Sequence, residues 1–152
     1  MNITLRSATI DDAEELTDLC MVSKKSHGYD ENFMERCKDE LTVTLRQIQD
    51  NYFWVAECDI ICGCTCLKVD ADKTTGEIEA FFVHPEFQKL GVGRILWNKI
   101  IQTAHKDRLT MLHLDSDPFA EGFYKKFGFT TTRYVPSGSI AGRTIPYMEM
   151  SL

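Results

Sequence analysis

The chain has 152 residues, 43% of them hydrophobic and 26% charged, an ordinary composition for one globular domain. A formal net charge of −6 does not attract nucleic acid, and no apolar stretch is long enough to cross a bilayer, so we expect neither a nucleic-acid nor a membrane partner. The N-terminus lacks the apolar segment of a signal peptide, so we expect a cytoplasmic protein whose six cysteines are free thiols.

The first half of the sequence predicts two helices between strands. A strand over residues 3–8 precedes a helix that begins in the acidic run 11–15 and buries Leu16, Leu19, Cys20 and Val22. Residues 26–30 break this pattern, and helical spacing predicts a second helix over 31–48, with a weak point at 42–44. Residues 53–58 and 61–69 then predict a hairpin of two strands.

The second half predicts strands that alternate with helices. A strand over 76–83 ends at His84-Pro85, and a helix begins near Gly91. A strand over 110–114, a short helix over 119–127 and a strand over 129–134 follow. Pro146 indicates that the final strand, 144–150, lies at a sheet edge, which would give a route to a homodimer. The whole pattern predicts one α/β domain over residues 1–152.

The segment VHPEFQKLGVGR carries the strongest chemical signal. Gly91 and Gly93 stand at the start of a predicted helix, where free backbone N–H groups and the helix dipole favour a phosphate or pyrophosphate. The Walker pattern is absent, and Leu96 stands where a dinucleotide fingerprint needs a third glycine. An ordinary strand-to-helix turn would also account for the two glycines.

A second segment, AEGFYKKFGF, follows about thirty residues later. With IDDAEEL near the N-terminus and the Gln88-x-x-Gly91-x-Gly93 element, it resembles the GNAT superfamily of N-acetyltransferases over nearly the whole chain. The resemblance implies a mixed, mostly antiparallel sheet flanked by helices. It also implies an antiparallel beginning to that sheet and an opening between the strands that end at Val83 and Leu114. Acetyl-CoA is the implied co-substrate.

The resemblance also implies the cofactor contacts. Backbone amides from Lys89 to Arg94 would hold the pyrophosphate, with the Arg94 side chain adding charge. The implied set comprises Gln88, Lys89, Leu90, Gly91, Val92, Gly93 and Arg94. The backbone of Phe82 and Val83 would pair with the pantetheine arm, and the Val83 N–H would polarise the thioester carbonyl. Asp117 stands where the family often has a pantetheine-binding asparagine, and a carboxylate cannot donate that hydrogen bond.

The same resemblance implies the catalytic groups. Tyr124 would protonate the departing thiolate, although Phe123, Tyr124 and Phe127 also suit a plain aromatic core. Glu77 and Glu79 are candidates for the base that removes the proton of the amine. Strand alternation places them on one face with Phe81 and Val83. Two solvated strand carboxylates are the alternative.

The acceptor is expected to be a small-molecule amine that the sequence does not identify. His27 and Tyr29 lie in a segment that commonly borders the acceptor pocket in the family, so both are candidate substrate contacts. A loop histidine can equally be only exposed. His84 is expected to be a strand-end residue.

Two other readings compete with an enzyme. A non-catalytic acyl-CoA-binding sensor would explain Asp117, whereas Tyr124 argues against it. A metal or redox protein could use Cys62, Cys64 and Cys66. However, an i, i+2 row on a strand directs its sulfurs the same way about 6.6 Å apart, which suits a tetrahedral zinc cage poorly. We therefore expect buried thiols and no metal.

Overall fold

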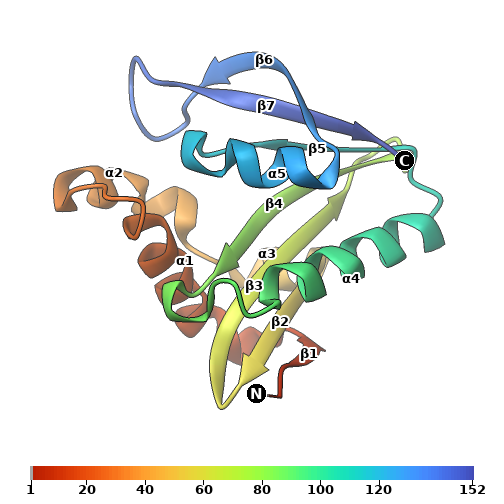
Figure 1. Cartoon of the computed structure of the whole chain (residues 1–152), viewed down its shortest axis with the longest axis horizontal. Coiled ribbons are helices and arrows are strands. Elements are labelled where there is room, and N and C mark those ends of the chain that lie inside the picture. Colours follow the sequence, from red (N-terminus) through yellow and green to blue (C-terminus); the bar gives the residue numbers. More distant parts are fainter. Residues whose placement is uncertain (1) are drawn as a thin grey trace.

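The computed structural model describes residues 2–152 as a seven-stranded sheet with helices on both faces, and it confirms the predicted α/β fold (Figure 1). The strand order is β1-β2-β3-β4-β5-β7-β6. The strands are β1 (Thr4–Ser7), β2 (Tyr52–Cys58), β3 (Ile60–Val69), β4 (Thr75–Val83), β5 (Met111–Asp115), β6 (Thr130–Pro136) and β7 (Thr144–Ser151). The helices are α1 (Ala13–Lys25), α2 (Glu31–Leu41), α3 (Leu45–Asp50), α4 (Val92–Lys106) and α5 (Glu121–Phe127). Within residues 2–152, every helix is too short or too polar to span a membrane.

The sheet opens in its middle. Every neighbouring pair of strands is antiparallel except β4 and β5, which run parallel. Their pairing covers only Thr75 to Glu77 on β4, against Met111 to His113 on β5. Beyond Glu77 the two strands diverge, so the last part of β4 has a strand neighbour on one side only. The predicted antiparallel beginning and the predicted opening are both confirmed.

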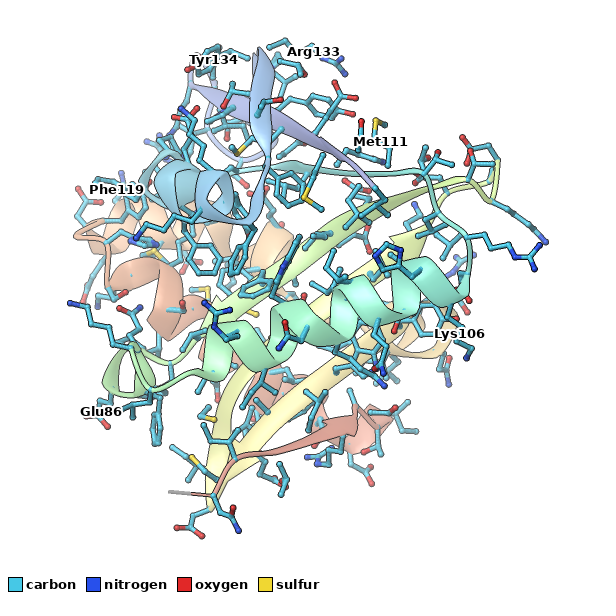
Figure 2. The ribbon with its side chains drawn as sticks, turned by 45° about the vertical axis from the view of Figure 1, so that its right-hand side comes forward. Glu86, Lys106, Met111, Phe119, Arg133 and Tyr134 are labelled. Atoms are coloured by element: carbon cyan, nitrogen blue, oxygen red, sulfur yellow. The ribbon has the colours of Figure 1, made fainter. Side chains whose placement is uncertain are left out.

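Each face of the sheet has its own core. Helix α1 contributes Leu16, Leu19 and Cys20 to a cluster that packs on β2, β3 and the end of β4. On the other face, α4 lies across the strands (Figure 2), and its residues Val92, Leu96, Ile100 and Ala104 recur every fourth position. This spacing keeps one face of α4 against the sheet. Val22, expected in the α1 stripe, is 45% exposed and lies outside the core.

The predicted helix over 31–48 is two helices, α2 and α3, separated at the weak point 42–44. The Thr44 side chain accepts a hydrogen bond from the Gln47 N–H (3.0 Å) and so begins a new helix. Val43 is buried, and its N–H donates to the Thr17 hydroxyl (2.9 Å). The chain therefore turns because a side-chain cap and a buried valine hold it there.

Two β-bulges change which side chains share a face. The register shifts between Cys66 and Leu67 opposite Glu79, so that Ile78 and Ala80 lie in different cores. Glu79 lies near the Cys66 thiol on the α1 side, whereas Phe81 packs toward α4. The prediction that Glu77 and Glu79 share a face with Phe81 and Val83 is therefore wrong for both glutamates, because a bulge inserts one residue into the alternation after them.

The second bulge lies opposite Ala56 and Glu57 and breaks the cysteine row. Cys62 packs in a cluster with Val92 and Leu96 of α4, whereas Cys64 and Cys66 belong to the core beneath α1. All three are fully buried, as predicted, but they do not line one face. All six cysteines are free thiols.

The expectation that Pro146 marks an edge strand is wrong. Strand β7 lies between β5 and β6, and β6 forms the edge. The Pro146 carbonyl oxygen accepts from the Ser116 N–H (2.8 Å), just past the last β5–β7 pair, Asp115 with Tyr147. Pro146 therefore faces Ser116, where β5 has ended, so the only β5–β7 hydrogen bond that it cannot donate lies beyond the end of the strand.

Candidate active site

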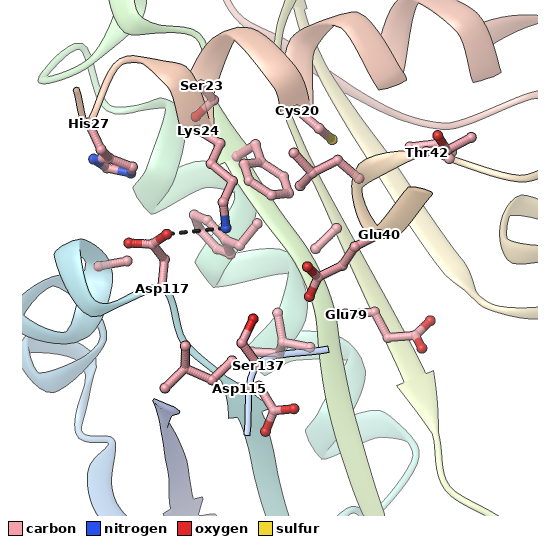
Figure 3. A pocket seen from close by; sticks show the side chains of 18 of the residues that line it. Cys20, Ser23, Lys24, His27, Glu40, Thr42, Glu79, Asp115, Asp117 and Ser137 are labelled. Carbon is pink, nitrogen blue, oxygen red and sulfur yellow. Dashed lines mark ion pairs between the residues drawn. The ribbon is translucent and has the colours of Figure 1, made fainter. Parts of the chain in front are cut away.

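A cavity lies where β4 and β5 separate, lined by α1, the α2–α3 region, β4, the end of β5, α5 and the β6–β7 loop. Among the predicted site residues it brings together His27, Glu79, Phe82, Asp117 and Tyr124. Figure 3 shows Lys24 reaching from α1 to Asp117, with Glu40, Asp115 and Glu79 on the other side. Glu77, Val83 and the loop residues Gln88 to Arg94 are outside this lining.

Tyr124 comes from α5, which ends at Gly128 in the left-handed conformation (φ 110°). Its ring packs edge-on against Phe81 and Phe129, with centroids 6.1 and 5.7 Å away, and the residue is 8% exposed. Burial raises the pKa of the Tyr124 phenol well above its ordinary value, and the Asp117 charge raises it further. The phenol therefore stays protonated at neutral pH, which is the state that a general acid requires.

The two strand glutamates differ in environment. Glu79 is exposed at the bulge, where the Asn51 amide donates to its carboxylate (3.5 Å). Glu77 is half-buried and lies beside His113 of β5. Burial, followed by the charge of Glu79, raises the pKa of the Glu77 carboxyl. A carboxylate with a raised pKa is a stronger base than an ordinary one, so basicity favours Glu77. Position favours Glu79, because Glu79 lines the cavity and Glu77 does not.

Asp117 is the centre of a polar network. The Tyr29 hydroxyl lies 2.9 and 3.1 Å from its two carboxylate oxygens, and the Lys24 ammonium lies 3.2 Å away. The Arg143 guanidinium is 3.8 Å from Asp117 and donates to the Tyr29 hydroxyl (2.6 Å). Despite burial, the Phe119 N–H and the Lys24 charge hold the Asp117 pKa below its ordinary value. Asp117 is therefore a carboxylate at neutral pH.

The segment after α1 presents aromatic rings beside this network. Tyr29 stacks on Phe33, with ring centroids 4.0 Å apart, and His27 stacks on Phe119 at 5.4 Å. Burial and the Asp117 hydrogen bond raise the pKa of Tyr29 to about 12. His27 lines the cavity, and Tyr29 borders it through Asp117.

The glycine loop forms the N-terminal end of α4. Gly91 is the N-cap, and its φ of 89° is a conformation that L side chains rarely adopt. Lys89 also has a positive φ (64°), so the chain turns sharply into the helix. The first N–H groups of any helix lack partners within it, and Lys89 and Arg94 are exposed nearby. The loop therefore has the free donors and the positive charge that suit a pyrophosphate.

The end of β4 presents backbone groups to the gap. The His84 N–H donates to the Cys62 carbonyl oxygen (2.8 Å), so His84 and Cys62 are a hydrogen-bonded pair of β3 and β4. Hydrogen-bonded pairs alternate with unbonded ones along an antiparallel pair of strands. Val83 is paired with Gly63, next to the bonded pair, so the backbone N–H and C=O groups of Val83 point away from β3. Those of Phe82 point toward it. The predicted donor Val83 therefore faces the side where β5 has left the sheet, whereas Phe82 does not.

The glycine loop and the Tyr124 helix are in contact. A Cβ built on Gly93 would lie 3.6 Å from the Phe123 ring and 3.9 Å from Phe81. Phe81 in turn contacts Tyr124. The helix start, the open end of β4 and the phenol thus meet at one place, although they are far apart in the sequence.

Sequence reasoning missed the charged residues that complete the cavity: Lys24, Glu40, Asp115 and Arg143. None lies in a motif, and Lys24 and Arg143 are 119 positions apart in the numbering of the chain. With Glu79 and Asp117, the lining holds four carboxylates against two cationic side chains, Lys24 and Arg143. Asp117 pairs with both of these cations.

Comparison with known proteins gives a match to the family model of the acetyltransferase (GNAT) domain over residues 11–152. An uncharacterised N-acetyltransferase of Methanocaldococcus jannaschii is 27% identical over 138 residues, which cover 83% of this chain and 60% of that protein. An uncharacterised N-acetyltransferase of Pyropia yezoensis is 36% identical over 47 residues, or 31% of this chain and 27% of that protein. The chain thus spans less than two thirds of the length of either relative.

Solved structures share the fold. PaiA N-acetyltransferase from Thermoplasma acidophilum, in complex with coenzyme A, superposes with a TM-score of 0.82 at 23% identity, and each chain is covered in full. A GCN5-related N-acetyltransferase from Rhodopseudomonas palustris gives a TM-score of 0.82 at 20% identity, over 100% of this chain and 97% of that chain.

Proposed function

Because the chain belongs to the GNAT acetyltransferase family, we propose that it transfers the acetyl group of acetyl-CoA directly to a primary amine of a small acceptor. The observation that carries this proposal is that Tyr124 and Glu79 line one cavity at the gap between β4 and β5. The glycine loop meets the same region through Gly93 and Phe123. An acid, a base candidate and an anion-binding helix start are the parts that such a transfer needs.

The co-substrate fits the residues present. The amides at the start of α4, with Lys89 and Arg94, would hold its pyrophosphate. The Val83 N–H, which faces the gap, would donate to the thioester carbonyl oxygen as negative charge develops there. Gly93 leaves the space beside Phe123 and Phe81 free of a side chain.

The chemistry needs three proton transfers. Glu79 or Glu77, directly or through water, accepts a proton from the ammonium form of the acceptor so that its nitrogen lone pair can attack the thioester carbon. The new C–N bond forms as the C–S bond breaks, and Tyr124 gives its proton to the departing thiolate. The acylated nitrogen then loses its second proton, directly or through water, to the Tyr124 phenolate, which restores the phenol and leaves a neutral amide. The mechanism assigns no role to the row Cys62, Cys64 and Cys66, because all three are fully buried. Burial raises the pKa of the Cys62 and Cys66 thiols, and a hydrogen bond with Cys20, followed by burial, raises that of Cys64.

The charge of the cavity supports an amine acceptor. An amine is protonated at neutral pH, and the four carboxylates of the lining outnumber the two cations, both of which already pair with Asp117. His27 and Tyr29 stand on the α1 side, where they would contact the body of the acceptor. An acceptor that arrives as a cation is therefore attracted to this cavity.

The test is release of coenzyme A thiol from acetyl-CoA across a panel of amines: polyamines, amino acids, aminoglycosides and peptides. We expect at least one amine to accelerate release, and Tyr124→Phe to slow kcat by roughly 100-fold or more. Tyr134→Phe, the same change on a tyrosine that is 63% exposed on β6, should have no effect. If the protein binds acetyl-CoA but turns it over with no amine, and Tyr124→Phe does not change that binding, the protein is instead a sensor.

A further inference from the structure

We propose that Asp117 is a positioning residue, which fixes the acceptor-side wall of the cavity against the helix that carries Tyr124. Its partners come from three places: Lys24 from α1, Tyr29 from the segment after α1, and Arg143 from the β6–β7 loop. Asp117 itself follows β5 and caps the short turn that leads into α5, since its carboxylate accepts from the Phe119 N–H (2.9 Å).

The burial of these groups makes the junction strong. The side chains of Lys24, Asp117 and Arg143 are 12%, 13% and 21% exposed. Removing one member of such a group leaves a charge without a partner in a place that water reaches poorly. Asp117 therefore contacts all three segments, and no other carboxylate makes an ion pair with Lys24 or Arg143 within residues 2–152.

The loop over the cavity depends on the same junction. Arg143 donates to the Tyr29 hydroxyl and lies over the Phe33 ring, 4.9 Å from its centroid. Ser139, in the same loop, donates to Glu40 of α2. Loosening Asp117 would thus remove the carboxylate that bridges Lys24 of α1 and Arg143 of the loop, and would leave the ammonium of Lys24 unpaired in the cavity that receives the amine.

This role differs from the pantetheine contact that the family resemblance implies at this position. Both carboxylate oxygens are engaged by Tyr29, and the cations come from the acceptor side. The substitution Asp117→Asn separates the two roles. It introduces the side chain expected for a pantetheine contact and keeps an oxygen for the Phe119 cap, but it removes the charge that holds Lys24 and Arg143.

A second substitution makes the charge argument testable. With Lys24, Arg143 and Asp117, the junction carries a net charge of +1, and D117N alone raises it to +2. The double variant D117N/K24M returns it to +1, with an apolar side chain of similar length in place of the ammonium. If charge balance holds the wall in place, the double variant should therefore recover what D117N loses.

The experiment compares the wild type, D117N and D117N/K24M by calorimetric binding of acetyl-CoA and by hydrogen exchange. We expect D117N to leave the acetyl-CoA Kd within about twofold. It should speed exchange in residues 24–33 and 137–143 but not in the loop 88–94, and the double variant should restore slow exchange. A roughly tenfold change in acetyl-CoA Kd with unchanged exchange would overturn the proposal in favour of a pantetheine contact. Faster exchange throughout the chain, or no rescue, would reduce Asp117 to a general stabilising residue and would also overturn it.

Kinetics add a readout that rests on the proposed function. With the fastest amine of the panel, D117N should raise the acceptor KM by roughly tenfold, because an unpaired Lys24 repels an ammonium, and should leave the acetyl-CoA KM unchanged. An unchanged acceptor KM would contradict the proposal. If the wild type acetylates no amine, the proposed function fails, while binding and exchange still decide the role of Asp117.

Discussion

Helix α4 passes so close to β3 that a Cβ on Gly63 would lie 2.6 Å from Cγ1 of Val92. The same Cβ would lie 3.2 Å from the Phe82 carbonyl oxygen. Glycine at this point lets the first turn of α4 rest on the sheet next to the end of β4. This contact sets where the glycine loop stands relative to Val83.

Substituting Gly63 should therefore affect both stability and cofactor binding. We expect Gly63→Ala to lower the free energy of unfolding by about 1–3 kcal/mol, because the methyl group displaces Val92. The shift of α4 should also weaken acetyl-CoA binding. Chemical denaturation and calorimetry measure the two effects. The control, Gly138→Ala, has open space around the added methyl and should change neither.

Gly91 offers a sharper test of the loop. Its φ of 89° makes alanine costly by about 1–2 kcal/mol, although no neighbouring atom would clash. Gly142 has a φ of 79° and equally open space, but it lies in the β6–β7 loop. We expect Gly91→Ala and Gly142→Ala to destabilise the protein to a similar degree, and only Gly91→Ala to weaken acetyl-CoA binding. Equal losses of binding in the two variants would argue against a pyrophosphate site at Gly91.

The pH dependence should identify the base. If Glu77 is the base, its raised pKa predicts that activity falls on the acid side at a pH above the ordinary glutamate value of about 4.3. Glu79→Gln removes a like charge, so the Glu77 pKa falls and the acid limb moves to lower pH. If Glu79 is the base, the same substitution abolishes most activity instead.

The measurement is kcat/KM against pH for the wild type, Glu77→Gln and Glu79→Gln with one amine, so that ionisation of the amine is common to all three. Tyr124 should not set the alkaline limb, because burial raises the pKa of the phenol and keeps it protonated. An acid limb that neither substitution moves would exclude both glutamates as the base.

Cysteine labelling should follow burial. Cys58 is partly exposed, whereas the other five cysteines are buried. We expect one equivalent of iodoacetamide to react with the native protein, at Cys58, and six to react after denaturation. Mass spectrometry of peptides identifies the site. Because no thiol takes part in the proposed transfer, the labelled protein should keep its activity. Loss of activity on labelling Cys58 alone would contradict this mechanism.

Much of the fold was predictable because its periodic patterns are local. The strand ends, the long helix after Gly91 and the short helix with Tyr124 all follow from residue spacing. The bulge at Glu79 was not predictable, since nothing in a strand's own sequence says how its neighbour is paired. The place of Pro146 in an interior strand likewise depends on where β5 ends.

The sequence by itself determined the family, and it indicated the glycine turn at the start of α4 and Tyr124 as the candidate acid. Each of these is carried by residues that lie close together in a motif. Only the tertiary structure decided what surrounds the acceptor. Lys24, Asp117 and Arg143 come from distant segments, and their pairing depends on how α1, the end of β5 and the β6–β7 loop meet. Burial then raises the pKa of Tyr124, and burial is a property of the packed chain rather than of any short stretch of it.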